Sequence, residues 1–500
     1  MAAFRGIPFG EAPVGERRWK PAAAAACWAP EVLSATQNGT ICYQGGGPGQ
    51  SEDCLNLNVF APGVNFLQKE EGLPVLVWIY GGGNYEGYAG NSEIENIVRK
   101  KEVVVVAMNY RLNVFGYLAL RELAEVDPRG VSGNYGITDQ QLALQWVQEN
   151  IASFGGAADK VTIIGHSSGA TNVHAHLASA SSAGLFHRAV SLSGSSNLTM
   201  DRACKEAQDR TLFLEPSHCG HQADVLACLY NMSTHDLWKA LPPSYSAWSP
   251  LYDYPVDTEG LGARVSALPY VDGVTVTHTL EAALEQGLND VPVILQGMQA
   301  EMDCYPDPSA EALTMSALPS FYNKMFAREY GESMPQEVFH LYGKYSDPAY
   351  AIYAVDSDTA VSCGLRQLAL LAKVGYTSPV YWGVVKGSPS HPFSESGQAI
   401  PSRFPFHGWD IKAAFEAWGD YTPSDEDRRF GEMLLDHWVA LATAGSLSGT
   451  MWAPVQDAGE GQVYGSDLGK AHGRPILDMK IEECTFWSSV DVGKNWRWIN

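Results

Sequence analysis

The sequence Gly165-His166-Ser167-Ser168-Gly169 directly follows a short apolar run at residues 161–164. A G-x-S-x-G pattern that leaves a buried strand predicts a sharp turn into a helix, in which the central serine is strained and presents its side chain. Glycines are expected on both sides because neighbouring backbone passes too close for a Cβ atom. A hydroxyl presented in this way can attack a carbonyl carbon, so Ser167 is the candidate nucleophile.

A second glycine-rich turn lies upstream, where the apolar residues 76–80 run into three consecutive glycines at 81–83. Such a turn can point backbone N–H groups into a cavity that no side chain obstructs. We predict that the N–H groups of Gly82, Gly83 and Ser168 form an oxyanion hole. A phosphate-binding loop is the alternative, but it would need G-x-x-x-x-G-K-[ST], and no lysine follows the glycines.

Composition narrows the class of protein. The 500 residues are 45% hydrophobic and carry a formal net charge of −23. This acidic balance argues against nucleic acid or an anionic membrane as a partner, since both need basic patches. No apolar run approaches the roughly 18 residues of a membrane span, and no signal peptide is visible at Met1. Because no linker or repeat divides the chain, we expect one domain over residues 1–500.

Short apolar runs alternate with amphipathic stretches along the chain. We expect strands at residues 75–80, 103–108, 161–164, 189–192, 293–296 and 380–385, most of them continuously apolar, as in parallel strands covered on both faces. A helix is expected at 138–154, and another opens at Thr422-Pro423, with the threonine as its cap. Alternating strands and helices predict an α/β fold with a large, mostly parallel, doubly wound central sheet and helices on both faces.

Further motifs occur in the order in which one enzyme family carries them. They are Phe4-Arg5-Gly6-Ile7-Pro8-Phe9, Ser51-Glu52-Asp53-Cys54-Leu55-Asn56-Leu57-Asn58, Asn109-Tyr110-Arg111-Leu112 and Gly133-Asn134-Tyr135-Gly136. The chain resembles the type-B carboxylesterase and cholinesterase family, densely over residues 4–195 and more sparsely to Trp487. The resemblance implies an α/β-hydrolase fold with long insertions, serine carboxylic-ester hydrolysis through an acyl-enzyme, and no metal or organic cofactor. The family's usual N-terminal strand pair is missing, so we expect a truncated start.

The nucleophile needs a base, and the expected chain order is serine, acid, histidine. Among 13 histidines, His407 stands in Phe406-His407-Gly408-Trp409-Asp410, which resembles the family's H-G-x-[ED] loop. His391 is the alternative, although its surroundings resemble no catalytic loop. His437 lies on an expected helix and is assigned to the core or the surface.

The acid of the triad is expected after the strand at 291–295. The family pattern there resembles G-x-x-x-x-E-G, but here the glycine is one residue closer to Glu301, and Met302 replaces the second glycine. Glu301 is the predicted acid and Asp303 the alternative. Such an acid holds one histidine tautomer and stabilises the imidazolium. A second departure is His166, where many relatives carry glutamate. We expect a packed polar residue there that adds no negative charge near the serine.

The resemblance also implies three disulfides, Cys42–Cys54, Cys219–Cys228 and Cys363–Cys484, and a buried Arg18–Glu52 ion pair. Cys27, Cys204 and Cys304 remain without an assigned partner. Three N-x-S/T sequons, at Asn38, Asn197 and Asn231, add to the cysteine pattern. Together they predict a secreted glycoprotein, or one from another oxidising compartment.

The predicted partner is a small-molecule ester, and the oligomeric state stays open. In cholinesterases the loop equivalent to residues 43–53 is longer and carries a tryptophan that binds quaternary ammonium. No tryptophan occurs here, which argues against choline esters and indicates a more open gorge. Trp248, Tyr252 and Tyr254 are candidates for the acyl pocket or a lid. A non-catalytic adhesion or hormone-precursor protein of this fold and an interfacial lipase are the competing functions.

Overall fold

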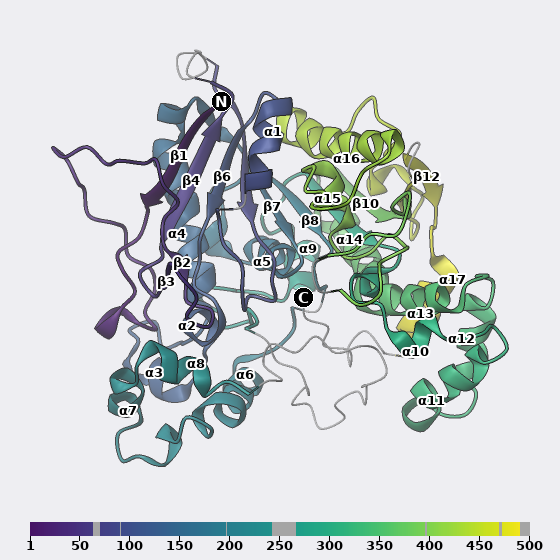
Figure 1. Cartoon of the computed structure of the whole chain (residues 1–500), viewed down its shortest axis with the longest axis horizontal. Helices are drawn as coiled ribbons and strands as arrows, with labels where there is room; N and C mark the ends of the chain where they lie inside the picture. The colour runs from purple at the N-terminus through teal and green to yellow at the C-terminus, as the bar shows by residue number, and fades with distance from the viewer. Residues whose placement is uncertain are drawn as a thin grey trace.

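The computed structural model describes residues 1–63, 71–90, 92–196, 198–242, 267–395, 398–469 and 473–490. Within these residues one sheet of ten strands runs in the order β1-β4-β6-β5-β7-β8-β9-β10-β11-β12 (Figure 1). The strands are β1 (Ala2–Pro8), β4 (Asn56–Ala61), β5 (Leu73–Ile79), β6 (Val104–Met108), β7 (Gly156–His166), β8 (Arg188–Leu192), β9 (Val293–Met298), β10 (Val380–Val385), β11 (Tyr464–Leu468) and β12 (Gly473–Leu477).

The centre of the sheet is parallel, from β6 through β5, β7, β8, β9 and β10 to β11. Antiparallel pairing is confined to β1, β4 and β12 at the two edges. All six expected strands are present. Because parallel strands end on one edge of a sheet, the turns that follow β5, β7 and β9 meet there, where ligands bind in open α/β sheets.

Helices cover both faces of this sheet, as its buried central strands require (Figure 1). Helix α5 (Ser168–Leu177) and helix α16 (Asp425–Ala444) each pack against β5, β7 or β8, and α14 (Cys363–Gly375) packs against β9 and β10. The longer remaining helices are α4 (Tyr135–Asn150), α6 (Arg202–Asp209), α11 (Leu318–Tyr330), α12 (Met334–Tyr342), α13 (Pro348–Ser357) and α17 (Ile481–Ser489).

The predicted start of α16 was wrong. The helix begins at Asp425, and its cap is Ser424 rather than Thr422. The Ser424 hydroxyl accepts the Asp427 N–H while the Asp427 carboxylate accepts the Ser424 N–H, which is a reciprocal capping box. This pair satisfies two backbone donors at once, which Thr422 two residues upstream does not do. The predicted helix at 138–154 is present as α4 followed by a short 3₁₀ turn, Ile151–Phe154.

All three predicted disulfides are present: Cys42–Cys54, Cys219–Cys228 and Cys363–Cys484. Cys27, Cys204 and Cys304 are in no disulfide. The third bridge ties α17 to α14 beside a second apolar cluster built on α10 (Pro308–Glu311) to α13, at the lower right of Figure 1. The C-terminal helix is therefore anchored to the body by a covalent bond.

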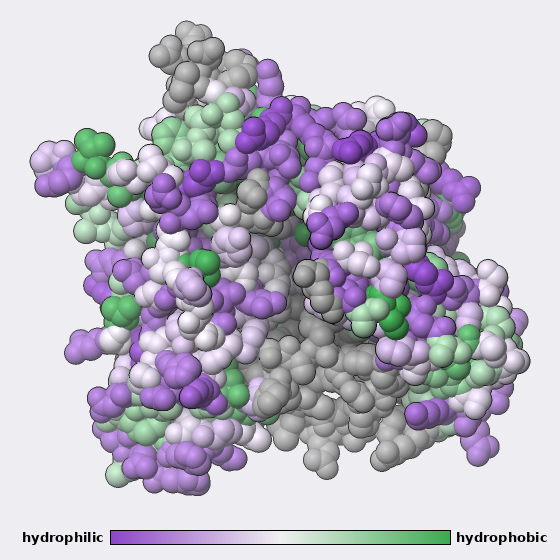
Figure 2. Space-filling model, in the orientation of Figure 1, coloured by the Kyte–Doolittle hydropathy of each residue, from purple (hydrophilic) through white to green (hydrophobic). Residues whose placement is uncertain are grey.

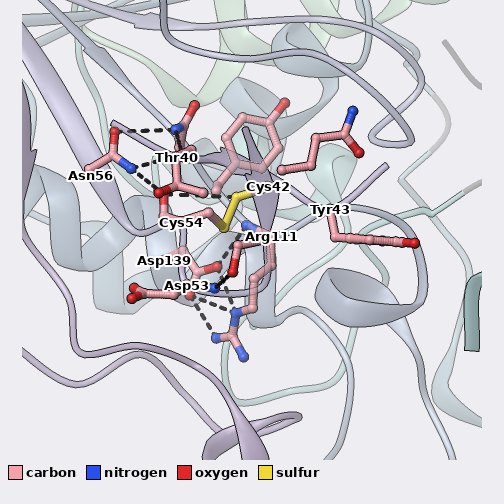
Figure 3. Close-up of a disulfide and its surroundings, with 12 residues drawn as sticks. Thr40, Cys42, Tyr43, Asp53, Cys54, Asn56, Arg111 and Asp139 are labelled. Carbon is pink, nitrogen blue, oxygen red and sulfur yellow. Dashed lines mark hydrogen bonds and ion pairs between the residues drawn. A yellow bond between two sulfur atoms is a disulfide. The ribbon is translucent and has the colours of Figure 1, made fainter. Parts of the chain in front are cut away.

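The Cys42–Cys54 disulfide lies beside two buried ion pairs. The predicted pair is present, with Arg18 donating from Nε and Nη2 to the two carboxylate oxygens of Glu52, each at 2.6 Å. Sequence reasoning missed the second pair, in which the Arg111 guanidinium and backbone N–H both donate to Asp139 (Figure 3). Arg111 and Asp139 are 3% and 0% exposed, so breaking either pair on one side would strand a buried charge.

Hydrophilic residues dominate the face shown in Figure 2, where apolar residues form small scattered groups. The most exposed large apolar side chains are far apart in the chain, among them Val32 and Val374. Among the described residues, no helix combines the length and apolar character needed to cross a membrane.

Candidate active site

Ser167 occupies the turn between β7 and α5. Its backbone has φ 60° and ψ −130°, a conformation that a residue with a side chain rarely adopts. The Ser167 N–H donates to the carbonyl of Leu192 at the end of β8, at 2.9 Å, which fastens the turn to the sheet. The strain predicted from the sequence is therefore present, and it sits at the carboxyl edge of the sheet.

The glycines that flank the serine are needed for close packing. A Cβ atom on Gly165 would lie 2.3 Å from the carbonyl oxygen of Gly169, and one on Gly169 would lie 2.1 Å from the oxygen of Ile79. Real Cβ atoms do not approach this closely. The helix therefore starts directly against the end of β5, and only glycine permits it.

The triple-glycine loop follows β5 and touches this turn. Ile79 pairs with Gly165 in the sheet, and a Cβ on Gly81 would lie 2.7 Å from the Ser167 Cβ. Gly82 and Gly83 both have positive φ, 114° and 63°. Because these glycines have no side chains, their backbone reaches the rim beside the candidate nucleophile.

A side chain that sequence reasoning missed joins this loop to the helix. The Asn84 N–H donates to the Ser168 hydroxyl at 2.9 Å, and its side chain bonds Asn172 on α5. Asn84 is fully buried and has positive φ, 54°. Its position directly after the glycines was the signal, since asparagine tolerates this backbone region.

Glu301 follows β9 in a short 3₁₀ helix, Glu301–Cys304, and contacts His407. The Glu301 Oε2 and His407 Nδ1 atoms are 2.6 Å apart, and the two side chains are 2% and 10% exposed. The other carboxylate oxygen accepts the Met298 N–H at 2.8 Å. The backbone N–H of His407 donates to the backbone carbonyl of Glu301 at 3.0 Å, so the two residues are joined through backbone and side chain.

Asp303, the alternative acid, has a different partner. Its Oδ2 accepts the N–H groups of Arg403 and Phe404 at 2.7 and 2.6 Å. Burial raises the pKa of Asp303 to about 7, against these two hydrogen bonds, which lower it. Asp303 therefore braces the loop that carries His407, whereas Glu301 contacts the imidazole itself.

Two more polar groups lie near the acid: Ser357, which no local motif marked, and Asp410, the acidic residue of the His407 motif. The Ser357 hydroxyl at the end of α13 accepts the Glu301 N–H at 2.7 Å. Asp410 accepts a hydrogen bond from Gln296 of β9 at 2.6 Å. Burial raises the pKa of Asp410 to about 6. Both contacts join segments far apart in the chain, which explains why the sequence did not reveal them.

The imidazole of His407 lies beside the serine turn, because its ring centroid is 4.5 Å from that of His166. The other histidines considered are elsewhere. His391 is exposed and contacts Tyr421, while His437 is buried against Trp452, and burial lowers its pKa to about 4.

Three predicted pocket residues, Trp248, Tyr252 and Tyr254, lie outside the described residues, as does Asn197 of the second sequon. Among the residues that are described, no group of three or more His, Cys, Asp or Glu side chains is placed to hold a metal ion.

The chain is similar to known esterases. The chain is 37% identical to acetylcholinesterase from Danio rerio over 334 residues, 61% of this chain and 48% of the relative, so it spans about half the length of that protein. It is 29% identical to para-nitrobenzyl esterase from Bacillus subtilis, over 89% of this chain and 86% of the relative.

A solved PNB esterase structure superimposes with a TM-score of 0.75 at 26% identity, covering 97% of this chain and 95% of that one. The predicted α/β-hydrolase fold is thereby confirmed. A model of the carboxylesterase family matches residues 1–487. The chain belongs to the carboxylesterase family.

Proposed function

We propose that this protein is a serine carboxylic-ester hydrolase with Ser167 as nucleophile, His407 as base and Glu301 as acid. The observation that carries the proposal is the Glu301–His407 pair, 2.6 Å apart and packed against the strained serine turn. The strained serine turn and the Glu301–His407 pair come from three separate segments, and they support the arrangement that acyl transfer needs.

In the first step the Ser167 hydroxyl attacks the ester carbonyl and its proton passes to His407. Negative charge develops on the former carbonyl oxygen, and the N–H groups of Gly82, Gly83 and Ser168 stabilise it. Glu301 holds Nδ1–H of the imidazole and stabilises the positive charge that forms on the ring. His407 then returns the proton to the departing alcohol, which leaves an acyl-enzyme on Ser167.

In the second step water attacks the acyl-enzyme. His407 removes a proton from the water, and the same N–H groups stabilise the oxyanion of the tetrahedral intermediate. The acid product then leaves as Ser167 regains its proton. These two steps use only side chains and backbone of this chain.

The substrate class we propose is uncharged esters rather than choline esters. The loop between Cys42 and Cys54 has no tryptophan, and its Tyr43 ring packs edge-on against Phe115 and Trp238. Tryptophan gives the strongest cation–π attraction, so a loop without it is a poor site for a quaternary ammonium group. Benzyl esters are the first candidates, since one relative is a para-nitrobenzyl esterase.

We further propose a single catalytic domain that folds in an oxidising compartment. Three disulfides support this location, because thiols stay reduced in the cytosol. Two sequon asparagines, Asn38 and Asn231, are exposed and could carry glycans in a secreted protein.

Hydrolysis of p-nitrophenyl esters of increasing chain length tests the proposal. We expect turnover of short-chain esters by the native protein, and loss of turnover in Ser167→Ala with an unchanged melting temperature. Alanine there inherits the same strained backbone, so folding should not change. No turnover by folded native protein would favour an adhesion role, and activity only on long-chain esters at an interface would favour a lipase.

A further inference from the structure

His166 is the residue before the candidate nucleophile, and it forms part of the surface on which the candidate base rests. Its ring lies 4.5 Å from the His407 ring, with 44° between the two planes. A Cβ placed on Gly408 would lie 3.5 Å from His166 Cε1, so the backbone of the histidine loop also runs past this ring. His166 is 7% exposed, and no described residue forms a hydrogen bond with its Nε2 atom.

His166 is uncharged at neutral pH. Burial lowers the pKa of His166 well below 6.5, and repulsion from His407 and Lys412 lowers it further. Lys412, on the helix α15 (Trp409–Ala414), forms an ion pair with Glu395. A buried imidazole without an acidic partner stays neutral, because burial disfavours its charged form and no carboxylate offsets that cost.

The other charged groups facing the base come from two elements. Glu301, on the 3₁₀ turn after β9, contacts the imidazole directly, and Asp410, at the start of α15, acts on it through space. Burial raises the pKa of Asp410 to about 6, and its carboxylate accepts a hydrogen bond from Gln296 rather than from the imidazole. Glu301 is therefore the one carboxylate among these groups that contacts the His407 ring. A carboxylate at position 166 would be a second carboxylate beside the His407 ring.

We propose that His166 is a positioning residue, whose neutral ring holds the His407 imidazole against the serine turn without adding negative charge to it. This inference rests on the proposed function. A base that faces one carboxylate loses its proton at lower pH than a base that faces two, because each negative charge favours the imidazolium. The acidic limb of ester hydrolysis therefore lies at lower pH with histidine at 166 than with glutamate.

Three substitutions separate the ring from the charge. His166→Glu should move the midpoint of the acidic limb of kcat/KM upward by at least about one pH unit. His166→Ala should lower kcat about tenfold with little change in KM, because the imidazole loses the surface that orients it. His166→Phe keeps a neutral ring, so it should recover most of the kcat lost in the alanine variant and keep the native midpoint.

His437→Phe is the matched control, since His437 is also buried and uncharged but packs against Trp452. It should leave both kcat and the pH midpoint at native values. Melting temperatures show which variants fold. If His166→Glu does not fold, the comparison of kcat in His166→Ala and His166→Phe still tests the positioning role.

A native midpoint in His166→Glu, native kcat in His166→Ala, or equal losses in the alanine and phenylalanine variants would each overturn the inference and leave the proposed ester hydrolase standing. Absence of hydrolysis in the native protein would instead contradict the proposed function, and with it this role for His166.

Discussion

Replacing Glu301 with glutamine should lower kcat about a thousandfold while KM and the melting temperature stay close to native. Glutamine has nearly the shape of glutamate and can still accept the Met298 N–H, which lies 2.8 Å from Oε1. It cannot supply negative charge to His407. Its amide group can also donate to Nδ1, which would place the ring proton on Nε2, where it blocks removal of the serine proton.

The magnitude follows from the geometry. The carboxylate and the ring touch at 2.6 Å, and the side chains are 2% and 10% exposed. With charge centres about 4 Å apart and an effective dielectric constant of about 20, the lost attraction to the imidazolium is about 4 kcal/mol. Since each 1.36 kcal/mol is tenfold in rate, the loss is about three powers of ten.

Asp303→Asn is the matched control. Asp303 binds two backbone N–H groups, of Arg403 and Phe404, and an amide oxygen can replace its carboxylate there. Because burial raises the pKa of Asp303 to about 7, much of its charge is already lost at neutral pH. We expect less than about a tenfold loss in kcat. Initial rates with p-nitrophenyl butyrate at pH 7 measure both variants. A larger loss in Asp303→Asn than in Glu301→Gln would refute the assignment of the acid.

Three further predictions concern stability. Gly169→Ala should lower the free energy of unfolding by at least about 2 kcal/mol, measured in urea, because its Cβ would meet the Ile79 oxygen at 2.1 Å; native stability would show that the helix can move. Replacing both Cys363 and Cys484 with alanine should cost about 4–5 kcal/mol, because the bridge closes a loop of 121 residues; a loss below about 1 kcal/mol in thermal unfolding would speak against this account. Burial lowers the pKa of His174 from 6.5 to about 4. The contribution of neutral His174 to the free energy of unfolding is therefore complete above pH 6.5. It falls by about 3 kcal/mol by pH 4, because the unfolded chain binds a proton that the folded chain excludes. His174→Gln should flatten that slope in urea titrations, and an unchanged slope would mean that other groups cause it.

The structure confirmed sequence expectations where the cause was local. Continuous apolar runs gave the strand at 380–385 with the same bounds, since β10 is Val380–Val385. The strain at Ser167 and the need for glycine at 165 and 169 follow from a strand that turns at once into a helix. These features depend on neighbours a few residues away, so the sequence contains their cause.

Expectations were incomplete where local signals competed. Thr422 and Ser424 are both good helix caps, and Pro423 favours a start at Thr422. The reciprocal bond between Ser424 and Asp427 decided for the serine. This pair is a local signal, because its residues are three apart in the sequence.

The sequence favoured Glu301 as the acid and left Asp303 open as the alternative. Glu301 and Asp303 lie two residues apart on one short turn, and both are buried. Their partners come from residues 403–407, a hundred positions along the chain. Only the folded chain shows that one carboxylate meets the imidazole while the other meets backbone.

The amino-acid sequence was enough to predict the parallel sheet, the strained serine turn, the glycine loop and, through family resemblance, the three disulfide partners. Only the folded chain shows that Glu301 contacts His407, that Asp303 and Ser357 bind nearby backbone N–H groups, and that His166 lies beside the His407 ring. The reason is physical. Backbone strain and apolar periodicity act over a few residues, whereas the approach of two rings or of a carboxylate and an imidazole depends on how the whole sheet brings distant turns to one edge.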